Sequence, residues 1–428
     1  MAYHLREKHY WIWLCAGKVA TAVAFVWRRL MFRTTFIAIT GSVGKTTAKE
    51  CIAAMLAAHA PIVKTFDTQN GRFFVARAIL RVRPGHRFAV IEVATNRPGG
   101  LWSEARLVNP DLALILSVAQ THSNNFNSLE EIAQEKARML DALRPGGTAV
   151  LNGDDPRVLA MAKGARKKVR IAGSSPQFDV WADEISSIWP DRLSFRVHCG
   201  SESRRVRTRL VGEHWLGTAL ASLAIALECG VSLEAAATAL ETAPPYRARL
   251  EPVELPSGAI MLRDDFNDEL STLAPALRVL EQAIAARRIL VMSGALDPKS
   301  KTKGKLMDAG RLVVHSADLV VFVGEDAMHH AECAAAAGLE NAAMRAFPSL
   351  PDAAKFLNDE LRNGDLVLLR GLLMDHIQRL LFAQFGSVGC WKPTCAKQCL
   401  CDHCPELRPG LERAAGAPAP AWPFWHPL

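Results

Sequence analysis

Residues 36–47 read FIAITGSVGKTT, a short apolar segment that runs directly into a glycine-rich turn. The apolar residues predict a buried strand, and a helix is expected to begin near Lys45. Gly41 and Gly44 permit a tight turn, so several backbone N–H groups and the positive end of the helix dipole can point to one place. This arrangement predicts a site for the phosphates of a nucleotide.

The nucleotide expected in this turn is ATP with Mg²⁺. Lys45 would reach the terminal phosphates, and the Thr46 hydroxyl would bind the metal. The glycine spacing is shorter than the full Walker pattern, and a coincidental strand–turn–helix is the alternative. Agreement between strand, glycines, lysine, paired threonines and helix favours the phosphate site. The loop residues expected to contact ATP are Gly41, Ser42, Val43, Gly44, Lys45, Thr46 and Thr47.

The amino-acid composition is typical of a globular protein. The 428 residues suffice for two or three domains, and half of them are hydrophobic. The formal charge of +8 suits an anionic substrate or membrane surface, and because no nucleic-acid-reading motif accompanies it, no nucleic-acid partner is expected. Five of the ten cysteines are scattered through apolar stretches, as reduced core residues are, which together with ATP use favours a cytoplasmic protein.

The N-terminal segment is almost wholly apolar over residues 10–27 and is followed by Arg28 and Arg29. Lys18 lies in the middle of this run, and placing a lysine at the centre of a membrane costs about 2.5–3.5 kcal/mol. The run also barely reaches the ~20 residues that a membrane span needs. No small-residue cleavage site follows, which argues against a cleaved signal. We therefore expect a helix on the inner membrane surface or packed on the first domain, rather than an anchor.

Apolar strands alternate with helical stretches along most of the chain, which predicts an α/β fold of mostly parallel sheets. The Pro-Pro pair at 244–245 marks a domain boundary. We expect an N-terminal helix in 1–35, a doubly wound ATP-binding domain in 36–243, a smaller Rossmann-like domain in 244–386, and a Cys-rich and Pro/Trp-rich tail in 387–428.

Three polar residues, at strand ends or on the helix that follows, limit the kinds of reaction that this site could support. Glu92 closes an apolar strand, His122 follows the strand of 112–117, and Lys136 lies on the next helix. Singly, each has an ordinary interpretation as a salt-bridged acid, a loop histidine or a solvated lysine. Together after the phosphate loop, Glu92 and His122 are candidates to hold a second divalent cation.

In these motifs the sequence resembles the Mur ligase family, and within it the enzymes that add D-alanyl-D-alanine to a muramyl peptide. The resemblance covers about residues 36–385. The glycine-rich turn looks like the family's ATP loop, Glu92 and His122 match its metal-binding residues, and Lys136 matches its N-carbamylated lysine. Asn152-Gly-Asp-Asp also resembles a family turn. Arg249 resembles the arginine that contacts ATP, and the Asp-Asp-Phe-Asn run from Asp264 to Asn267 resembles a motif that lies against the nucleotide.

The resemblance implies an amide-forming ligase. A substrate carboxylate would attack the γ-phosphate of ATP, and an amine would then displace phosphate from the acyl phosphate. Lys45 and two Mg²⁺ would offset the charge on the phosphoryl oxygens, and carbamylation would turn Lys136 from a cation into a carboxylate-like metal ligand. Its partners would be carboxylate and amine small molecules or peptides.

The sequence departs from the family pattern mainly on the substrate side. Only about 35 residues precede the loop, so we expect the UDP-binding first domain to be absent and the substrate to differ from the standard UDP-muramyl peptide. Residues 68–71 (TQNG) keep one asparagine of a paired motif, and 370–373 (RGLL) replace a Lys-Gly-Ser-Arg loop. The alternative class is an ATP-binding regulatory or scaffold protein that has lost ligation.

Five cysteines lie within residues 390–404 and have no place in that pattern. Four thiols at such short spacings fit Zn²⁺. An Fe–S cluster and a metal-free tail are the alternatives. The expected zinc ligands are Cys395, Cys399, Cys401 and Cys404.

Overall fold

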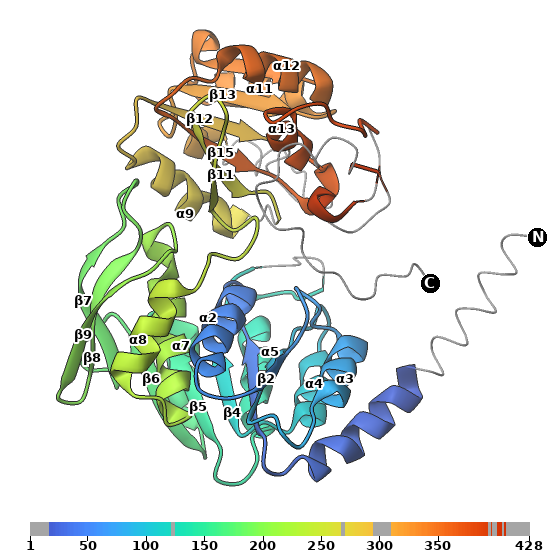
Figure 1. The fold of residues 1–428 in the computed structure, drawn as a ribbon, viewed down its shortest axis with the longest axis vertical. Coiled ribbons are helices and arrows are strands. Elements are labelled where there is room, and N and C mark those ends of the chain that lie inside the picture. The colour runs from blue at the N-terminus through green and yellow to red at the C-terminus, as the bar shows by residue number, and fades with distance from the viewer. Residues whose placement is uncertain are drawn as a thin grey trace, which may run out of the picture. The chain divides into compact units, whose positions relative to one another are not determined.

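The structure is a computed structural model that describes residues 17–120, 125–266, 270–293, 310–392, 395, 400–404 and 406–407. It divides into two compact units, Met1–Tyr246 and Arg247–Leu428. Both are α/β units built on largely parallel sheets, so the predicted fold class is confirmed. Figure 1 shows the elements of each unit.

The first unit contains a nine-stranded sheet in the order β2-β3-β1-β4-β5-β6-β7-β8-β9. Pairing is parallel from β2 through β7, and β7, β8 and β9 form an antiparallel extension at one edge (Figure 1). The strands are β1 (Thr35–Thr40), β2 (Ile62–Lys64), β3 (Phe88–Glu92), β4 (Leu112–Ile115), β5 (Thr148–Asn152), β6 (Lys168–Gly173), β7 (Val180–Ser186), β8 (Ser194–Cys199) and β9 (Glu202–Arg207).

Helices cover both faces of this sheet, because the central strands bury both sides. Ile37 and Ile39 of β1 pack into one core with α2, α7 and α8, whereas Phe36 and Ala38 pack into a second core with α3, α4 and α5. The helices are α2 (Lys45–Ala57), α3 (Arg72–Arg81), α4 (Gly100–Val108), α5 (Leu129–Asp141), α6 (Pro156–Ala160), α7 (Leu216–Glu228) and α8 (Leu233–Thr242), with 3₁₀ turns at Met161–Gly164 and Glu213–Trp215.

Residues 17–30 are helical and pack on the first unit. The Trp27 indole donates to the Val82 carbonyl at 2.9 Å, and Arg28 donates to the Val108 carbonyl at 2.7 Å. Within the described part of the chain, no helix combines the length and the apolarity needed to cross a bilayer.

The second unit has a six-stranded sheet in the order β10-β11-β15-β12-β13-β14, parallel except for β10. Its strands are β10 (Glu251–Glu254), β11 (Ile260–Asp264), β12 (Arg287–Met292), β13 (Leu319–Val323), β14 (Met344–Phe347) and β15 (Asp365–Arg370). Its helices are α9 (Leu270–Glu281), α11 (Ala327–Ala336), α12 (Leu350–Glu360) and α13 (Gln378–Ala383), with 3₁₀ turns at Asn341–Ala343, Leu373–Asp375 and Cys401–His403.

One helix differs from the sequence expectation. The leucine-rich run 373–385 predicts a continuous helix, but the structure has a 3₁₀ turn, a break at His376 and then the short α13. His376 has φ of 53°, a left-handed conformation that no α-helix contains, so the hydrogen-bond ladder cannot continue through it.

Candidate active site

The phosphate loop is held in one shape by contacts with the strand end beside it. Gly44 caps α2 with φ of 87°, and a Cβ there would lie 2.8 Å from the Thr218 hydroxyl oxygen. The Ser42 hydroxyl bonds both the carbonyl and the N–H of Ala119 at 2.9 Å, and the N–H of Val43 donates to the Ser117 hydroxyl at 2.9 Å. Both the left-handed backbone at Gly44 and the contacts of the loop with its neighbours therefore favour this turn.

The start of α2 is suited to an anion. No described side chain caps this helix end, and its first turn carries no acidic residue. Lys45 folds back over the loop, where its ammonium donates to the carbonyls of Gly41 at 2.8 Å and Ser42 at 3.0 Å. Uncapped N–H groups and a lysine ammonium at a helix N-terminus are the elements of a phosphate site.

Glu92 is the centre of a polar cluster beside this loop. Its side chain is 1% exposed, and it accepts hydrogen bonds from the Thr46 hydroxyl at 3.0 Å and the Asn70 amide at 2.8 Å. The fully buried Lys49 lies 4.0 Å from the same carboxylate. Sheet register places Glu92 opposite Ile39, at the carboxyl end of the parallel strands where ligands bind in such folds.

Two of these groups suit a magnesium ion. Hydroxyl and carboxylate oxygens are the ligands that Mg²⁺ prefers, and Thr46 and Glu92 present them 3.0 Å apart. Among the described residues, Lys49 is the cation that pairs with this carboxylate, at 4.0 Å. The residues present therefore fit the metal.

Lys136 lies half-buried on α5, next to a small cavity of about 20 Å³ that Thr40 and Thr95 also line. Such a volume holds about one water molecule. The neighbouring Glu135 also lines this cavity, and its carboxylate accepts from the N–H groups of Gly99 and Leu101 at 2.8 Å and so caps α4. The structure thus brings Thr40 at the loop's strand and Lys136 to one cavity.

Three of the expected site residues lie outside the described residues: His122, Asn267 and Cys399. Their roles stay predictions.

The nucleotide-facing residues expected in the second unit lie around the end of β11. The Arg249 guanidinium stacks 4.9 Å from the centre of the Phe266 ring, and the residues on both sides of it, Ala248 and Leu250, have positive φ. Backbone strain of this kind, about 1–3 kcal/mol a residue, persists where the surroundings fix a side chain. Asp264 forms an ion pair with Arg370, which is 1% exposed.

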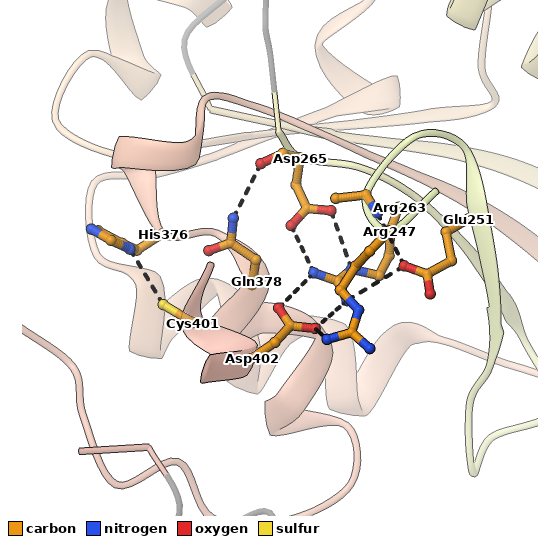
Figure 2. A network of polar contacts seen from close by, with 9 residues as sticks. Arg247, Glu251, Arg263, Asp265, His376, Gln378, Cys401 and Asp402 are labelled. Atoms are coloured by element: carbon orange, nitrogen blue, oxygen red, sulfur yellow. Dashed lines mark hydrogen bonds and ion pairs between the residues drawn. The ribbon is translucent and has the colours of Figure 1, made fainter. Parts of the chain in front are cut away.

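The Cys-rich segment is tied to the rest of the second unit by charged side chains. Arg263, buried between two carboxylates, donates two hydrogen bonds to Asp265 at 3.1–3.2 Å and two to Asp402 at 2.7 and 2.9 Å (Figure 2). Burial acts to raise the pKa of Asp402, but Arg263 outweighs it and holds that pKa below its usual range.

The expected zinc ligands are not gathered into a metal site in the described residues, where no group of three His, Cys, Asp or Glu side chains is placed to hold an ion. Cys401 and Cys404 instead lie in an apolar cluster with Cys390 and Leu407. Burial raises the pKa of Cys401 to about 12, so it is a thiol at neutral pH, and the His376 Nδ1 lies 3.3 Å from its sulfur.

Lys49 is a polar residue of the site that sequence reasoning missed. It lies 4.0 Å from Glu92, and its one local signal is that it follows Lys45 by one helical turn. The motifs that contain Asn70 and Asp155 were noted from the sequence, but their contacts were not. Asn70 donates to Glu92, and Asp155 accepts from the N–H of Val118 at 2.7 Å next to the phosphate loop, and both contacts join residues far apart in sequence.

A doubly wound sheet with a phosphate loop after β1 and oxygen ligands at the end of β3 defines a nucleotide-binding α/β protein. Comparison with family models narrows the class. Residues 39–226 match the Mur ligase middle domain, and residues 248–372 match the Mur ligase glutamate ligase domain.

Relatives agree with these matches. The chain is 32% identical over 374 residues to the UDP-N-acetylmuramoyl-tripeptide–D-alanyl-D-alanine ligase of Mycobacterium tuberculosis, a match that covers 83% of this chain and 73% of the relative. The Escherichia coli ligase of the same name is 29% identical over 268 residues, covering 62% and 59%. Crystal structure II of MurF from Acinetobacter baumannii aligns with a TM-score of 0.78 at 27% identity, covering 85% of this chain and 79% of that one.

The chain belongs to the Mur ligase family and is close to the D-alanyl-D-alanine-adding ligases. The family consists of ATP-dependent ligases, so the class expected from the sequence is confirmed.

Proposed function

We propose that this protein is an ATP-dependent, ADP-forming ligase that joins a carboxylate to an amine through an acyl phosphate. The observation that carries the proposal is the cluster of Thr46, Glu92 and Lys45 at one strand edge, with Lys136 beside the same edge. A protein that only binds a nucleotide needs the loop, but it does not need a lysine placed to become a metal ligand.

Each residue has a role that follows from its chemistry. The N–H groups of the loop and Lys45 would hold the phosphates, and Lys45 would offset charge on the phosphoryl oxygens as the carboxylate attacks. Thr46 and Glu92 would hold Mg²⁺, which supplies Lewis-acid stabilisation of the transferring group when bound. Carbamylated Lys136 and His122 are proposed ligands of a second Mg²⁺, and Arg249, Asp264 and Asn267 are proposed to contact the nucleotide.

We further propose that the acid or amine differs from the standard UDP-muramyl peptide pair. Arg370 stands where the family has a lysine that faces the substrate, but here its guanidinium pairs with Asp264 and donates to the Thr272 hydroxyl at 2.6 Å. Asn70, the retained asparagine, donates to Glu92. Both groups are therefore committed to partners within the protein, which supports an altered set of substrate contacts.

A phosphate-release assay over a panel of amino acids, dipeptides and carboxylates tests the ligase. We expect one acid–amine pair to stimulate ADP formation, and Lys45→Ala and Lys136→Ala to lower the stimulated rate at least about 100-fold. Lys163→Ala, at an exposed lysine of the Met161–Gly164 turn, is the matched control and should keep the rate.

ATP turnover that no pair stimulates, and that Lys136→Ala leaves unchanged, contradicts the ligase. That result would favour the second class, an ATP-binding regulatory or scaffold protein.

A further inference from the structure

A groove of about 1350 Å³ lies in the first unit between the helical residues 17–30 and the helices α3 and α4. Its lining is mostly apolar. The apolar side chains that matter here are Ala22, Phe25, Val26, Phe73, Trp102 and Leu107. Three of these are partly exposed, Phe25 at 40%, Val26 at 57% and Phe73 at 37%, and the Arg29 guanidinium lies 3.4 Å from the centre of the Phe25 ring.

The helix that forms one wall of the groove is fixed in place. Arg28 is 3% exposed and donates to the carbonyls of Val108 and Asn109, both at 2.7 Å, while it pairs with Asp111 at 3.1 Å. Because α4 ends at Val108, these bonds tie the helix to the C-terminal end of α4. The groove is therefore part of the folded unit and not a gap beside a loose segment.

Four cations surround this apolar lining: Lys18, Arg72, Arg97 and Arg106. All four are exposed, and none makes an ion pair with any residue that the structure describes. The Arg106 guanidinium lies 5.3 Å from the Trp102 ring, on the groove wall. Four exposed charges of one sign along one groove, with no ion pair among the described residues, repel each other and attract an anion.

The carboxylate of Glu104 offsets the positive charges of these side chains only in part. Glu104 of α4 is 6% exposed and interacts electrostatically with Arg72 and Arg97. Burial raises the pKa of Glu104 to about 7, against the pull of those two arginines. At neutral pH it is therefore ionised in only part of the molecules.

Two of these cations lie close along the chain to residues of the proposed metal site. Arg72 follows by two residues Asn70, which bonds Glu92, and Arg97 lies in the loop that leaves β3 directly after Glu92. An anionic group held by Arg72 and Arg97 would bring whatever it carries toward the proposed metal site.

We propose that this groove binds a long-chain lipid phosphate, with the chain along Phe25, Phe73 and Trp102 and the phosphate on Arg72, Arg97 and Arg106. The ligase substrate would then be carried on a lipid. An apolar groove with exposed arginines in its lining matches an amphiphile with an anionic head better than a free nucleotide sugar or a bare anion. The role of the groove in holding a ligase substrate rests on the proposed function. The binding of a lipid phosphate in the groove does not depend on that function.

Farnesyl diphosphate below its micelle concentration is the probe, with the full chain and without ATP. We expect saturable binding, read by tryptophan fluorescence and calorimetry, at least about tenfold tighter than isopentenyl diphosphate, since each buried CH₂ contributes about 0.8 kcal/mol. Arg97→Glu/Arg106→Glu should weaken binding at least about tenfold. Arg77→Glu, an exposed arginine of α3 outside the groove, should not. Phe25→Asn, which removes only apolar lining, should weaken farnesyl diphosphate and leave isopentenyl diphosphate unchanged.

Three results overturn the inference: no binding, equal binding of inorganic pyrophosphate and farnesyl diphosphate, or binding that Arg97→Glu/Arg106→Glu leaves intact while its thermal transition matches wild type. Binding to phosphatidylglycerol vesicles without binding of the monomeric probe would also overturn it, in favour of a membrane-surface helix. If the probe binds as expected but no substrate pair stimulates ATP turnover, the proposed ligase function fails and the groove stands.

Discussion

At the residue scale, Glu92 carries the most specific information in the molecule. A carboxylate that is 1% exposed has to be satisfied, and here a threonine hydroxyl, an asparagine amide and a lysine surround it. The threonine is the one that immediately follows the phosphate-loop lysine. In the proposed function, metal binding and phosphate binding would therefore be coupled through a single pair of neighbouring residues, Lys45 and Thr46.

Thr46→Val tests that coupling, because valine keeps the shape of the side chain and removes the hydroxyl. We expect Mg²⁺-dependent ATP turnover to fall about 100-fold. The lost bond to Glu92 should cost about 1–3 kcal/mol of unfolding free energy. Thr238→Val, at an exposed threonine of α8, is the matched control. Turnover with an unchanged Mg²⁺ dependence in Thr46→Val would remove Thr46 from the metal site.

Glu104 gives a pH-dependent stability. Burial raises its pKa from 4.5 to about 7, so in the folded chain it keeps a proton that the unfolded chain loses first. Its contribution to stability therefore falls as pH rises from about 4.5 to about 7 and is level above that. Glu104→Gln, which cannot ionise, should be more stable than wild type above pH 7 by on the order of 1–3 kcal/mol, with the difference shrinking toward pH 4.5. Thermal unfolding across this range measures it, and a difference that stays constant with pH contradicts the burial of an ionisable group.

At the scale of elements, the alternation of apolar strands and helices determines most of what can be predicted from the sequence. Strands such as β1 and β13 read as continuous apolar runs because both of their faces are buried, and their positions agree with the structure. The run β6 to β9 was not predicted, since its strands carry many charged residues and half-exposed faces. The break at His376 was not predicted either, because leucines on both sides mask a single left-handed residue.

The same limits apply to the site. The glycines and Lys45 lie close together in sequence, so the phosphate loop can be predicted from one short segment. The meeting of Glu92 with Asn70 is not, because it depends on how a loop crosses the edge of the sheet. The return of Asp402 to Arg263 spans 139 positions and has no local signal.

Gly44 is the residue on which the loop-to-helix junction depends. Gly44→Ala forces a left-handed alanine and places its Cβ against the Thr218 hydroxyl, so we expect loss of about 1–2 kcal/mol and at least tenfold weaker ADP binding. Gly230→Ala is the matched control, because Gly230 has φ of 84° with open space around its Cβ position. It should lose similar stability and keep nucleotide binding. Equal ADP affinity in both variants would contradict the phosphate loop.

At the scale of the whole molecule, two units of similar architecture divide the work. The first carries the phosphate loop and the proposed metal residues, and the second carries Arg249 and Asp264, which are proposed to contact the nucleotide. The C-terminal Cys-rich segment belongs to the second unit through the buried pair of Arg263 with Asp265 and Asp402 (Figure 2).

Removing the two sides of that network should have unequal effects. Arg263→Met leaves two carboxylates buried together and should cost about 3–5 kcal/mol, whereas Asp402→Asn leaves the Arg263–Asp265 pair intact and should cost about 1–3 kcal/mol. Calorimetry of the full chain measures both. Metal analysis of the same samples tests the tail, since stoichiometric zinc that disappears in Cys401→Ser/Cys404→Ser would show that thiols as well as charge hold the segment.

In the proposed reaction, the γ-phosphoryl group of ATP bound at the phosphate loop is transferred to a carboxylate. The acid that best stimulates ATP turnover should be prepared with ¹⁸O in its carboxylate, and the phosphate released during ligation analysed by mass spectrometry. An acyl-phosphate ligase transfers one labelled oxygen from the acid to each phosphate released, and Lys136→Ala should abolish both release and label. Phosphate that carries no label while ADP accumulates would show that water, not a carboxylate, accepts the phosphoryl group, and would contradict the account.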